Sequence, residues 1–383
     1  MKYLYLAFTL MLGASLTIAQ TPEKKKEEIR EMKKQIRQEF KHRTTTQFNE
    51  NRQSPSAMPS KSKAFGDNPG WSWSDAIGGS GWDHVKEIVT DPNNNIYITG
   101  SFSGEISLGD SSYTSEGLRD GFVAKFDNNR NLQWFQQINA SNHKRVNLAA
   151  ITIDDSGNLY ATGSFIGSIT VGGNTLTATD NRNVFYIKLS NSGQIQQAVS
   201  NDWIDDGKEI LTDQAGNIYI LANFAIFKYD SSGNLVFEIG ENDTFNDFIL
   251  IDNSLYYVGT VNDTSGTIGN VSYSTNYYQD NNMFFAKSDT SGTFSMVKLA
   301  KHSAPNHETR GHKMSTDSNK NIYISGIFNS SLIMDSVQVT GGSDVGFIAK
   351  LDTSGTAEWA STEEFGDIYN PVPIATSHDN ITY

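Results

Sequence analysis

The stretch IYITGSF, Ile96–Phe102, decides the fold of this 383-residue chain, because close copies of it recur along the sequence. The copies are LYATGSF from Leu159, IYILANF from Ile218, LYYVGTV from Leu255 and IYISGIF from Ile322, and ITY from Ile381 matches the start of a sixth. A phrase that returns every few dozen residues is typical of a repeat architecture, in which each copy marks one structural unit.

Each unit extends beyond this phrase in a way that predicts four strands. An apolar run and an Asp-rich turn, such as DDSGN from Asp154, lie upstream, and an apolar run with a Lys, such as GFVAKFD (Gly121–Asp127), lies downstream. A second Asp/Gly turn and a fourth apolar run, such as NLQWFQQI from Asn131, complete the unit. Asp, Asn and Gly favour tight hairpin turns. We therefore expect a meander of four antiparallel strands in every unit.

Four of the units carry an additional segment between the second and third strands, and the third unit lacks it. The four segments are EISLGDSSYTS, SITVGGNTLTA, TIGNVSYST and LIMDSVQVTG. Each alternates apolar and polar residues around a Gly or Asp, which predicts a small extra hairpin.

These features predict an all-β chain that folds as a β-propeller of four-stranded antiparallel blades, since such a blade buries its faces only against neighbouring blades. We expect the propeller in residues 64–383, with five complete blades and a sixth shared between the termini. The fourth strand of that sixth blade corresponds to WSWSDAIGG (Trp71–Gly79), and its first two strands to PVPIATSHDNITY at the C-terminus. Its third strand has no counterpart, so the propeller is expected to be incomplete at the C-terminus.

The combination of a D-x-x-G-N turn, an IYITGSF-like strand, a Gly-rich segment, a DGFVAKFD-like strand and a Trp-containing strand resembles the SBBP type of bacterial β-propeller repeat. The resemblance covers Trp71 to Tyr383. It implies a propeller fold and an exported or surface-located bacterial protein, without implying a particular activity.

The N-terminal residues form two further regions. Residues 1–19 have one Lys followed by a short apolar run and small residues, which predicts a cleaved signal peptide, with an uncleaved membrane anchor as the alternative. Residues 20–63 contain 12 Lys and Arg against 6 Asp and Glu, with apolar residues near one helical face, which predicts a short charged helix and a linker. Localisation in the periplasm, at the cell surface or outside the cell follows, with no membrane insertion after signal cleavage.

Charge and composition limit the possible partners. The whole chain has a formal net charge of −13, of which the basic arm contributes +6 and Lys2 +1, so residues 64–383 carry −20. Such a body repels nucleic acid and anionic membranes. The absence of Cys excludes disulfides and thiolate metal sites.

The links that enter the first strand of each blade are the expected ligand-binding region, because variable loops on a rigid scaffold usually carry function. These links and the extra segments are expected on one face, here called the long-loop face. Aromatic, carboxylate and basic side chains there suit sugars or polar peptides through stacking and hydrogen bonds. The candidate ligand-binding residues are Trp82, Asp83, His84, Arg145, Trp203, Asp205, Asp206, Asp243 and His307. The alternative is that they are ordinary polar loop residues.

No cofactor, metal site or catalytic residue is predicted. His302, His307 and His312 lack a metal-binding spacing, and the five-residue Asp turns lack the distant Glu of a calcium loop. A Lys recurs at one position of every third strand, as Lys125, Lys188, Lys228, Lys287 and Lys350. Its repetition favours a structural ion pair with the neighbouring blade over catalysis.

The leading hypothesis is a non-enzymatic binding or scaffold module for a glycan, peptide or protein on the long-loop face. One alternative is a glycan-cleaving enzyme that uses carboxylates at the channel mouth, with Asp83, Asp205, Asp206 and Asp243 as candidates. Another is a purely structural surface repeat.

Overall fold

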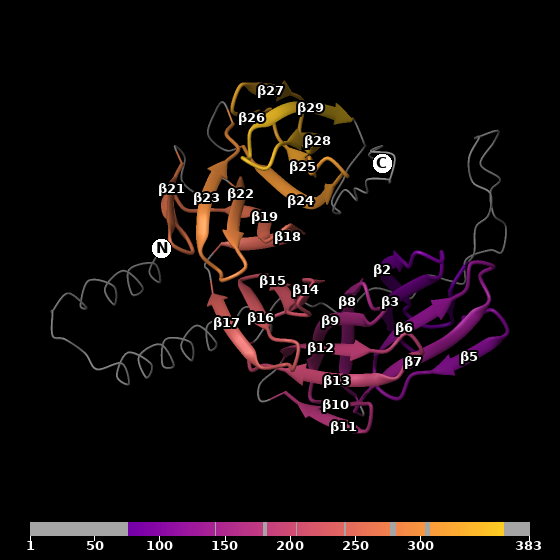
Figure 1. Cartoon of the computed structure of the whole chain (residues 1–383). Coiled ribbons are helices and arrows are strands. Elements are labelled where there is room, and N and C mark those ends of the chain that lie inside the picture. Colours follow the sequence, from indigo (N-terminus) through magenta and orange to yellow (C-terminus); the bar gives the residue numbers. More distant parts are fainter. Residues whose placement is uncertain are drawn as a thin grey trace, which may run out of the picture. The chain divides into compact units, whose positions relative to one another are not determined.

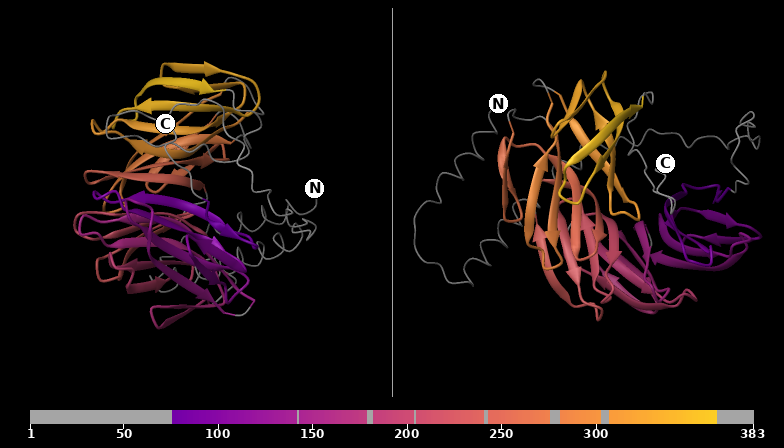
Figure 2. Two further views of the ribbon diagram at one scale, coloured as in Figure 1. Left: turned by 90° about the vertical axis from the view of Figure 1, so that its right-hand side faces the viewer. Right: turned by 45° about the horizontal axis from the view of Figure 1, so that its top comes forward.

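The computed structural model describes residues 76–363 apart from short gaps, and this part of the chain forms strands and turns without a helix (Figure 1, Figure 2). The gaps are residues 142, 179–181, 204, 241–242, 276–280 and 303–306. The expected signal peptide, charged arm and C-terminal strands, and most of the N-terminal strand expected from Trp71, lie outside the described residues. The all-β prediction is confirmed for the described part of the chain.

A meander of four antiparallel strands, here called a blade, occurs five times among the described residues. Blade 1 consists of β2 (His84–Thr90), β3 (Ile96–Phe102), β6 (Asp120–Phe126) and β7 (Leu132–Ala140). Blade 2 consists of β8 (Arg145–Ile153), β9 (Leu159–Ile166), β12 (Asn183–Leu189) and β13 (Ile195–Ser200). Blade 3 consists of β14 (Gly207–Thr212), β15 (Ile218–Ala222), β16 (Ala225–Tyr229) and β17 (Leu235–Gly240). Blade 4 consists of β18 (Thr244–Ile251), β19 (Ser254–Val261), β22 (Asn282–Asp289) and β23 (Phe294–Leu299). Blade 5 consists of β24 (Thr309–Thr316), β25 (Ile322–Phe328), β28 (Val345–Leu351) and β29 (Ala357–Glu363).

The turn between the first two strands of a blade is built around one Asp carboxylate. In blade 1, Asp91 Oδ1 accepts hydrogen bonds from the backbone N–H groups of Asn93 and Asn95, each at 2.9 Å. Asp91 Oδ2 accepts from Asn95 Nδ2 at 2.7 Å and from the Tyr97 hydroxyl at 3.0 Å. Burial alone would raise the pKa of Asp91, but these hydrogen bonds outweigh it and lower the pKa. The same arrangement recurs around Asp154, Asp213 and Asp317. The Asp turns are thus hairpin turns, as predicted.

The recurrent Lys of the third strand contacts a Tyr ring in its own blade. Its Nζ lies 5.1–5.2 Å from the ring centroid in the pairs Lys125–Tyr97, Lys188–Tyr160, Lys228–Tyr219 and Lys287–Tyr256. Lys228 Nζ also donates to the Thr290 carbonyl of blade 4 at 2.7 Å. Lys350 Nζ forms an ion pair of 2.7 Å with Glu358 of its own blade. The structural role is supported, but the predicted ion pair with a neighbouring blade is wrong: the contacts across the blade boundary are made to uncharged oxygens, the Thr290 carbonyl and Asn191 Oδ1.

The extra segments form hairpins, as predicted, and blade 3 has none. The hairpins are β4 (Glu105–Leu108) with β5 (Ser111–Thr114), β10 (Ser168–Val171) with β11 (Asn174–Thr177), β20 (Ser265–Ile268) with β21 (Val271–Ser274), and β26 (Ser331–Met334) with β27 (Val337–Thr340).

Two of these hairpins also join consecutive blades. β10 of blade 2 pairs with the end of β7 of blade 1, with Ile169 opposite Ala140. In blade 5, Ile333 and Lys301 of blade 4 exchange two backbone hydrogen bonds of 2.8 Å. β1 (Gly78–Gly79) pairs with β4 at the equivalent positions, with Gly79 opposite Ile106. β1 therefore contacts blade 1 as the end of a fourth strand of a preceding blade would.

Packing between blades follows the chain order. The first strands of successive blades contact one another: β2 with β8, β8 with β14, β14 with β18, and β18 with β24. Between blades 3 and 4, for example, Tyr219 and Leu221 pack with Phe245 and Phe248, and all four side chains are buried. The phrase that decides the fold contributes to these cores from both faces of β3, since Tyr97 packs against blade 2 while Ile98 and Phe102 belong to the core of blade 1.

Candidate functional site

The link before β2 carries an exposed aromatic cluster. The rings of Trp82 and His84 are stacked with centroids 3.9 Å apart, and the guanidinium carbon of Arg119 lies 3.6 Å from the Trp82 ring centroid. Both groups lie against the Trp82 ring, yet Trp82 is still 48% exposed. We call Trp82, His84 and Arg119 the stacked cluster.

The backbone holds the stacked cluster in place. Trp82 N–H donates to Ser103 Oγ at 2.7 Å, and Ser103 N–H donates to the Trp82 carbonyl at 3.1 Å. The Gly81 backbone lies so close to the Ser103 carbonyl that a Cβ there would be 1.6 Å from the oxygen, which excludes any larger residue. Arg119 is fixed by its N–H bond to Asn147 Oδ1 at 2.9 Å.

Arg145, the first residue of β8, lies beside Arg119. The two residues face each other across a parallel backbone bridge, and Val146 N–H donates to the Arg119 carbonyl at 2.9 Å. Burial and the charge of Arg145 lower the pKa of Arg119 to about 10. The structure thus brings the predicted residues Trp82, His84 and Arg145 to one junction, between blades 1 and 2. Arg119 was not predicted, because it lies in the link before the third strand rather than before a first strand.

Asp83, also predicted, serves the local backbone. Its Oδ2 accepts the Gly79 N–H at 2.7 Å, while its Oδ1 is buried without a hydrogen-bond partner among the described residues. Burial lowers the pKa of the adjacent His84, and the charges of Lys86 and Arg119 lower it further, whereas Asp83 acts in the opposite direction.

The second group of predicted residues, at the junction of blades 2 and 3, is occupied by internal contacts. Trp203 packs edge-on against Phe227 with ring centroids 6.0 Å apart. Asp205 is buried, and it accepts hydrogen bonds from Asn223 Nδ2 at 2.5 Å and from Phe224 N–H at 3.0 Å. Burial raises the pKa of Asp205. Asp206 accepts from Ser164 Oγ at 2.5 Å and pairs with Arg182 at 2.5 Å.

The two remaining predicted residues lie at other junctions. Asp243, between blades 3 and 4, accepts the Tyr273 hydroxyl at 2.8 Å, and burial raises the pKa of its carboxyl. His307, between blades 4 and 5, meets His302 edge-on with ring centroids 6.3 Å apart. Within the described residues, His, Asp and Glu side chains form no group of three or more that could hold a metal ion.

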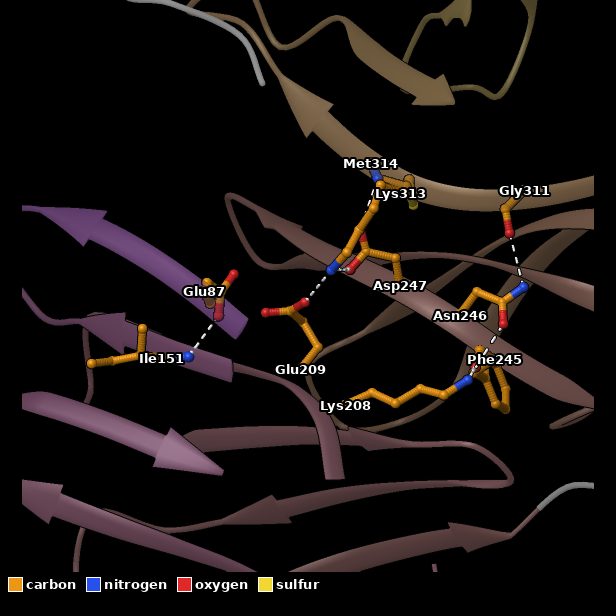
Figure 3. Close-up of polar contacts among 10 residues, drawn as sticks. All are labelled: Glu87, Ile151, Lys208, Glu209, Phe245, Asn246, Asp247, Gly311, Lys313 and Met314. Carbon is orange, nitrogen blue, oxygen red and sulfur yellow. Dashed lines mark hydrogen bonds and ion pairs between the residues drawn. The ribbon is translucent and has the colours of Figure 1, made fainter. Parts of the chain in front are cut away.

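A set of charged residues on the first strands was not predicted. Every first strand has a β-bulge at the same place, and the residue after it is Glu87, Ala150, Glu209, Asp247 or Lys313 in blades 1 to 5. Figure 3 shows the four charged members converging from β2, β14, β18 and β24. Lys313 Nζ lies 2.7 Å from Glu209 Oε2 and 3.5 Å from Asp247 Oδ1. We call Glu87, Glu209, Asp247 and Lys313 the inner charge cluster.

Two carboxylates of the inner charge cluster bind the following blade (Figure 3). Glu87 Oε2 accepts the Ile151 N–H of blade 2, and Asp247 Oδ2 accepts the Met314 N–H of blade 5, both at 2.6 Å. Ile151 and Met314 occupy equivalent positions, directly after the post-bulge residue. The carboxylates thereby satisfy backbone donors on the free edge of the next first strand.

Burial dominates the electrostatics of the inner charge cluster. It raises the pKa of Glu87 and of Asp247, and the charge of Glu209 adds to the effect on both. Burial alone would lower the pKa of Lys313, but the charges of Glu209 and Asp247 outweigh it and raise the pKa. Lys208, next to Glu209, donates to the Phe245 carbonyl at 2.7 Å, and burial lowers its pKa to about 8. A charged residue directly before the apolar run of a first strand, such as Glu209 before Ile210 and Leu211, was the sequence signal for this cluster.

A shallow hollow of about 260 Å³ lies at the hairpin junction of blades 4 and 5. It is lined by Lys298, Leu299, Lys301, Ile333 and Asp335. None of the predicted site residues borders it. No helix among the described residues is long and apolar enough to cross a membrane.

No known protein-family model matches the chain, so the resemblance to SBBP repeats stays a prediction. The chain is 24% identical over 333 residues to an uncharacterised WD repeat-containing protein of Acanthamoeba polyphaga mimivirus, an alignment that covers 76% of this chain and 23% of that protein. The chain therefore spans less than a quarter of the length of this curated relative. The similarity agrees with a repeat architecture.

Several solved structures are similar in part. One is the C-terminal WD40 domain of Sif2, with a TM-score of 0.41 and 10% identity over 78% of this chain and 77% of that chain. Another is a protein of unknown function from Bacteroides caccae, with a TM-score of 0.41 and 10% identity over 74% of this chain and 84% of that chain. A third is streptogramin B lyase, with a TM-score of 0.39 and 12% identity over 78% of this chain and 89% of that chain. At these scores the likenesses carry no argument about function. The assignment as a β-propeller repeat protein rests on the blades themselves.

Proposed function

We propose that the chain is an exported β-propeller that acts as a non-enzymatic binding or scaffold module for a glycan, peptide or protein ligand. The stacked cluster is the observation that supports this function best. It presents a half-exposed Trp82 next to cationic side chains on links held by the blade backbone. Exposed aromatic and Arg side chains on a rigid scaffold are typical of binding surfaces.

The carboxylates predicted for glycan cleavage support an enzyme less well. Glycoside hydrolysis requires two carboxyl groups about 5 to 10 Å apart that are free to act on the substrate. Asp205, Asp206 and Asp243 each hold their own link through hydrogen bonds or an ion pair, and Asp83 binds the Gly79 backbone. These contacts favour structural roles for all four.

The test is binding by the purified chain to glycan and peptide arrays, compared with two variants. Trp82→Ala removes the ring that orders the stacked cluster, and we expect it to lower the signal of the best ligand. Trp359→Ala removes another exposed Trp, on blade 5, and serves as the matched control that keeps the signal. Equal binding by the wild type and both variants would move the site away from blades 1 and 2.

Two further measurements address the other parts of the proposal. N-terminal sequencing of the protein produced in a bacterial host tests export, and a mature chain beginning after Ala19 is the expected result. Incubation with the bound glycan, followed by measurement of released reducing ends, tests the enzyme alternative. Release by the wild type but not by Asp205→Asn or Asp206→Asn would favour catalysis over binding.

A further inference from the structure

We propose that Arg119 and Arg145 form an anion-binding site for acidic glycans, in which the two guanidinium groups bind a uronate carboxylate. This inference rests on the proposed binding function and names the ligand class for the stacked cluster.

The positions of the two side chains carry the argument. Their backbones are joined by the parallel bridge between Arg119 and Arg145, which places both on one side of the junction between blades 1 and 2. The guanidinium carbon of Arg119 lies 3.6 Å from the Trp82 ring centroid, and Arg119 Nη1 donates to Asn147 Oδ1. A guanidinium has five N–H donors, so the groups that do not bind Asn147 can bind a carboxylate.

The charges at this junction are not balanced. Among the described residues, neither guanidinium forms an ion pair with a carboxylate. Lys86 adds a cationic group nearby, and Asp83 is the acidic residue that faces His84. Burial and, secondly, the charge of Arg145 lower the pKa of Arg119. In a chain with a formal net charge of −13, this uncompensated positive site is a feature that a bound anion would stabilise.

The backbone at the junction favours a glycan over a peptide. A peptide that binds by adding a strand to a sheet gains much of its affinity from backbone hydrogen bonds to an open edge. Here the N–H groups of Leu118 and Arg119 both donate to the Lys144 carbonyl, and the carbonyl of Trp82 accepts from Ser103. The available donors are therefore side-chain groups, which suit carboxylate and hydroxyl oxygens of an acidic sugar. The exposed side chains of Trp82 and Leu118 offer apolar surface for the C–H groups of such a sugar.

The pKa of His84 tests whether the two Arg residues bind an anion, because it would not change if they were only structural. A bound carboxylate would favour the protonated imidazole, so the pKa of His84, which is lowered in the free chain, should rise on binding. The groups that face His84 are Asp83, Lys86 and Arg119, and the first is engaged with Gly79. We therefore expect tighter binding as the pH falls through the titration of His84.

The experiment measures affinity by calorimetry and the His84 titration by NMR, with three probes: hexagalacturonate, a neutral glucose hexasaccharide and hexaglutamate. We expect hexagalacturonate to bind most tightly, to bind less tightly when salt rises from about 0.05 to about 0.5 M, and to raise the pKa of His84. Arg145→Gln and Arg119→Gln should each weaken its binding by about tenfold or more. Lys301→Gln, which removes an exposed cation on blade 4, should leave the affinity unchanged. Urea unfolding of each variant verifies that the fold is kept.

The other outcomes separate this inference from the proposed function. Equal binding of the neutral hexasaccharide, without an effect of the Arg variants, overturns the anion site but leaves a glycan-binding propeller. Preference for hexaglutamate overturns the glycan ligand and leaves a peptide-binding propeller. Binding of hexagalacturonate that Lys301→Gln weakens as much as Arg145→Gln would show a general charge effect and overturn the site. No binding of any probe, together with blank arrays, overturns both proposals.

Discussion

Blade 1 and the blades that follow it have the same apolar positions on their first strands, but they bury them to very different extents. Val85 and Ile88 on β2 are 46% and 59% exposed. Their counterparts on β8, Leu148 and Ile151, are 0% and 2% exposed because they pack against Tyr97 and Val123 of blade 1. The comparison shows that a blade does not bury its own first strand. Burial comes from the preceding blade, as expected for a repeat fold whose stability resides in the interfaces.

The opposite face shows the same dependence. Trp134 of blade 1 and Trp359 of blade 5 occupy equivalent positions, opposite Lys125 and Lys350. Trp134 donates its indole N–H to the Asn191 carbonyl of blade 2 at 3.0 Å and packs on Gly193 of the same turn. Trp359 retains the ring contact within its own blade but is 41% exposed. Blades 2 to 4 therefore gain stability from packing on two faces. Within the part of the chain that the structure describes, blades 1 and 5 gain it on one face.

The largest expected effect on stability is at the apolar first-strand position that Ile88 occupies in blade 1 and Ile210 in blade 3. Ile210 of blade 3 is fully buried, so Ile210→Ala should lower the free energy of unfolding by about 2 to 4 kcal/mol. Ile88→Ala removes the same atoms from an exposed position and should cost less than about 0.5 kcal/mol. Urea unfolding followed by fluorescence measures both. A cost for Ile88→Ala as large as that for Ile210→Ala would mean that Ile88 is covered in solution.

The second effect concerns the two Trp residues. Trp134→Ala removes a hydrogen bond and the packing against the blade 2 turn, and we expect a loss of about 1 to 3 kcal/mol. Trp359 packs on no such turn among the described residues, so Trp359→Ala should lower the free energy of unfolding by less than about 1 kcal/mol. Acrylamide quenching gives an independent check, since fluorescence from Trp359 should be quenched more readily than that from Trp134. Equal quenching and equal destabilisation would contradict the comparison.

The sequence predicted the parts of the fold that depend on neighbours along the chain. The Asp turns, the four-strand meander and the extra hairpins all involve residues close in sequence, and alternating apolar residues and turn chemistry are enough to identify them. Contacts between blades were predicted less well. The Lys of the third strand has a Tyr as its cross-strand partner, and its contact with the next blade reaches a carbonyl such as that of Thr290, a choice that no pattern within one unit reveals.

The candidate site shows the same limit. Trp82, His84 and Arg145 were predicted because they lie in the links before first strands, and the structure places them at one junction. Arg119 comes from a different link of blade 1, the one before its third strand, and it meets Arg145 through the packing of blade 1 on blade 2. Glu87 and Asp247 were missed because a one-residue bulge sets which side chain faces the next blade, and a bulge changes the alternation on which strand prediction relies.

The smallest expected effect is a pH dependence that distinguishes Glu87, on the first strand of blade 1, from an ordinary surface carboxylate. Glu87 has a folded-state pKa above its ordinary value of 4.5, owing to burial and to Glu209, while Asp247 and Lys313 are the other charged groups that face it. The folded chain therefore holds this proton when the unfolded chain has released it. Its contribution to stability is complete below about pH 4.5 and is lost as the pH rises through the folded-state pKa.

Glu87→Gln has no proton to lose, and its amide oxygen can still accept the Ile151 N–H. We expect the variant to match the wild type near pH 5 and to be more stable than the wild type by about 1 kcal/mol at pH 8, as measured by urea unfolding across this range. The stability of the variant should still fall somewhat as the pH rises, because the pKa of Asp247 is also raised above its ordinary value of 3.8. Glu105→Gln, at an exposed position on β4, is the matched control and should leave the profile unchanged. If the free energy of unfolding of Glu87→Gln followed the same pH profile as that of the wild type, Glu87 would be solvated in solution. The first strand of blade 1 would then be exposed at Glu87 as well as at Ile88.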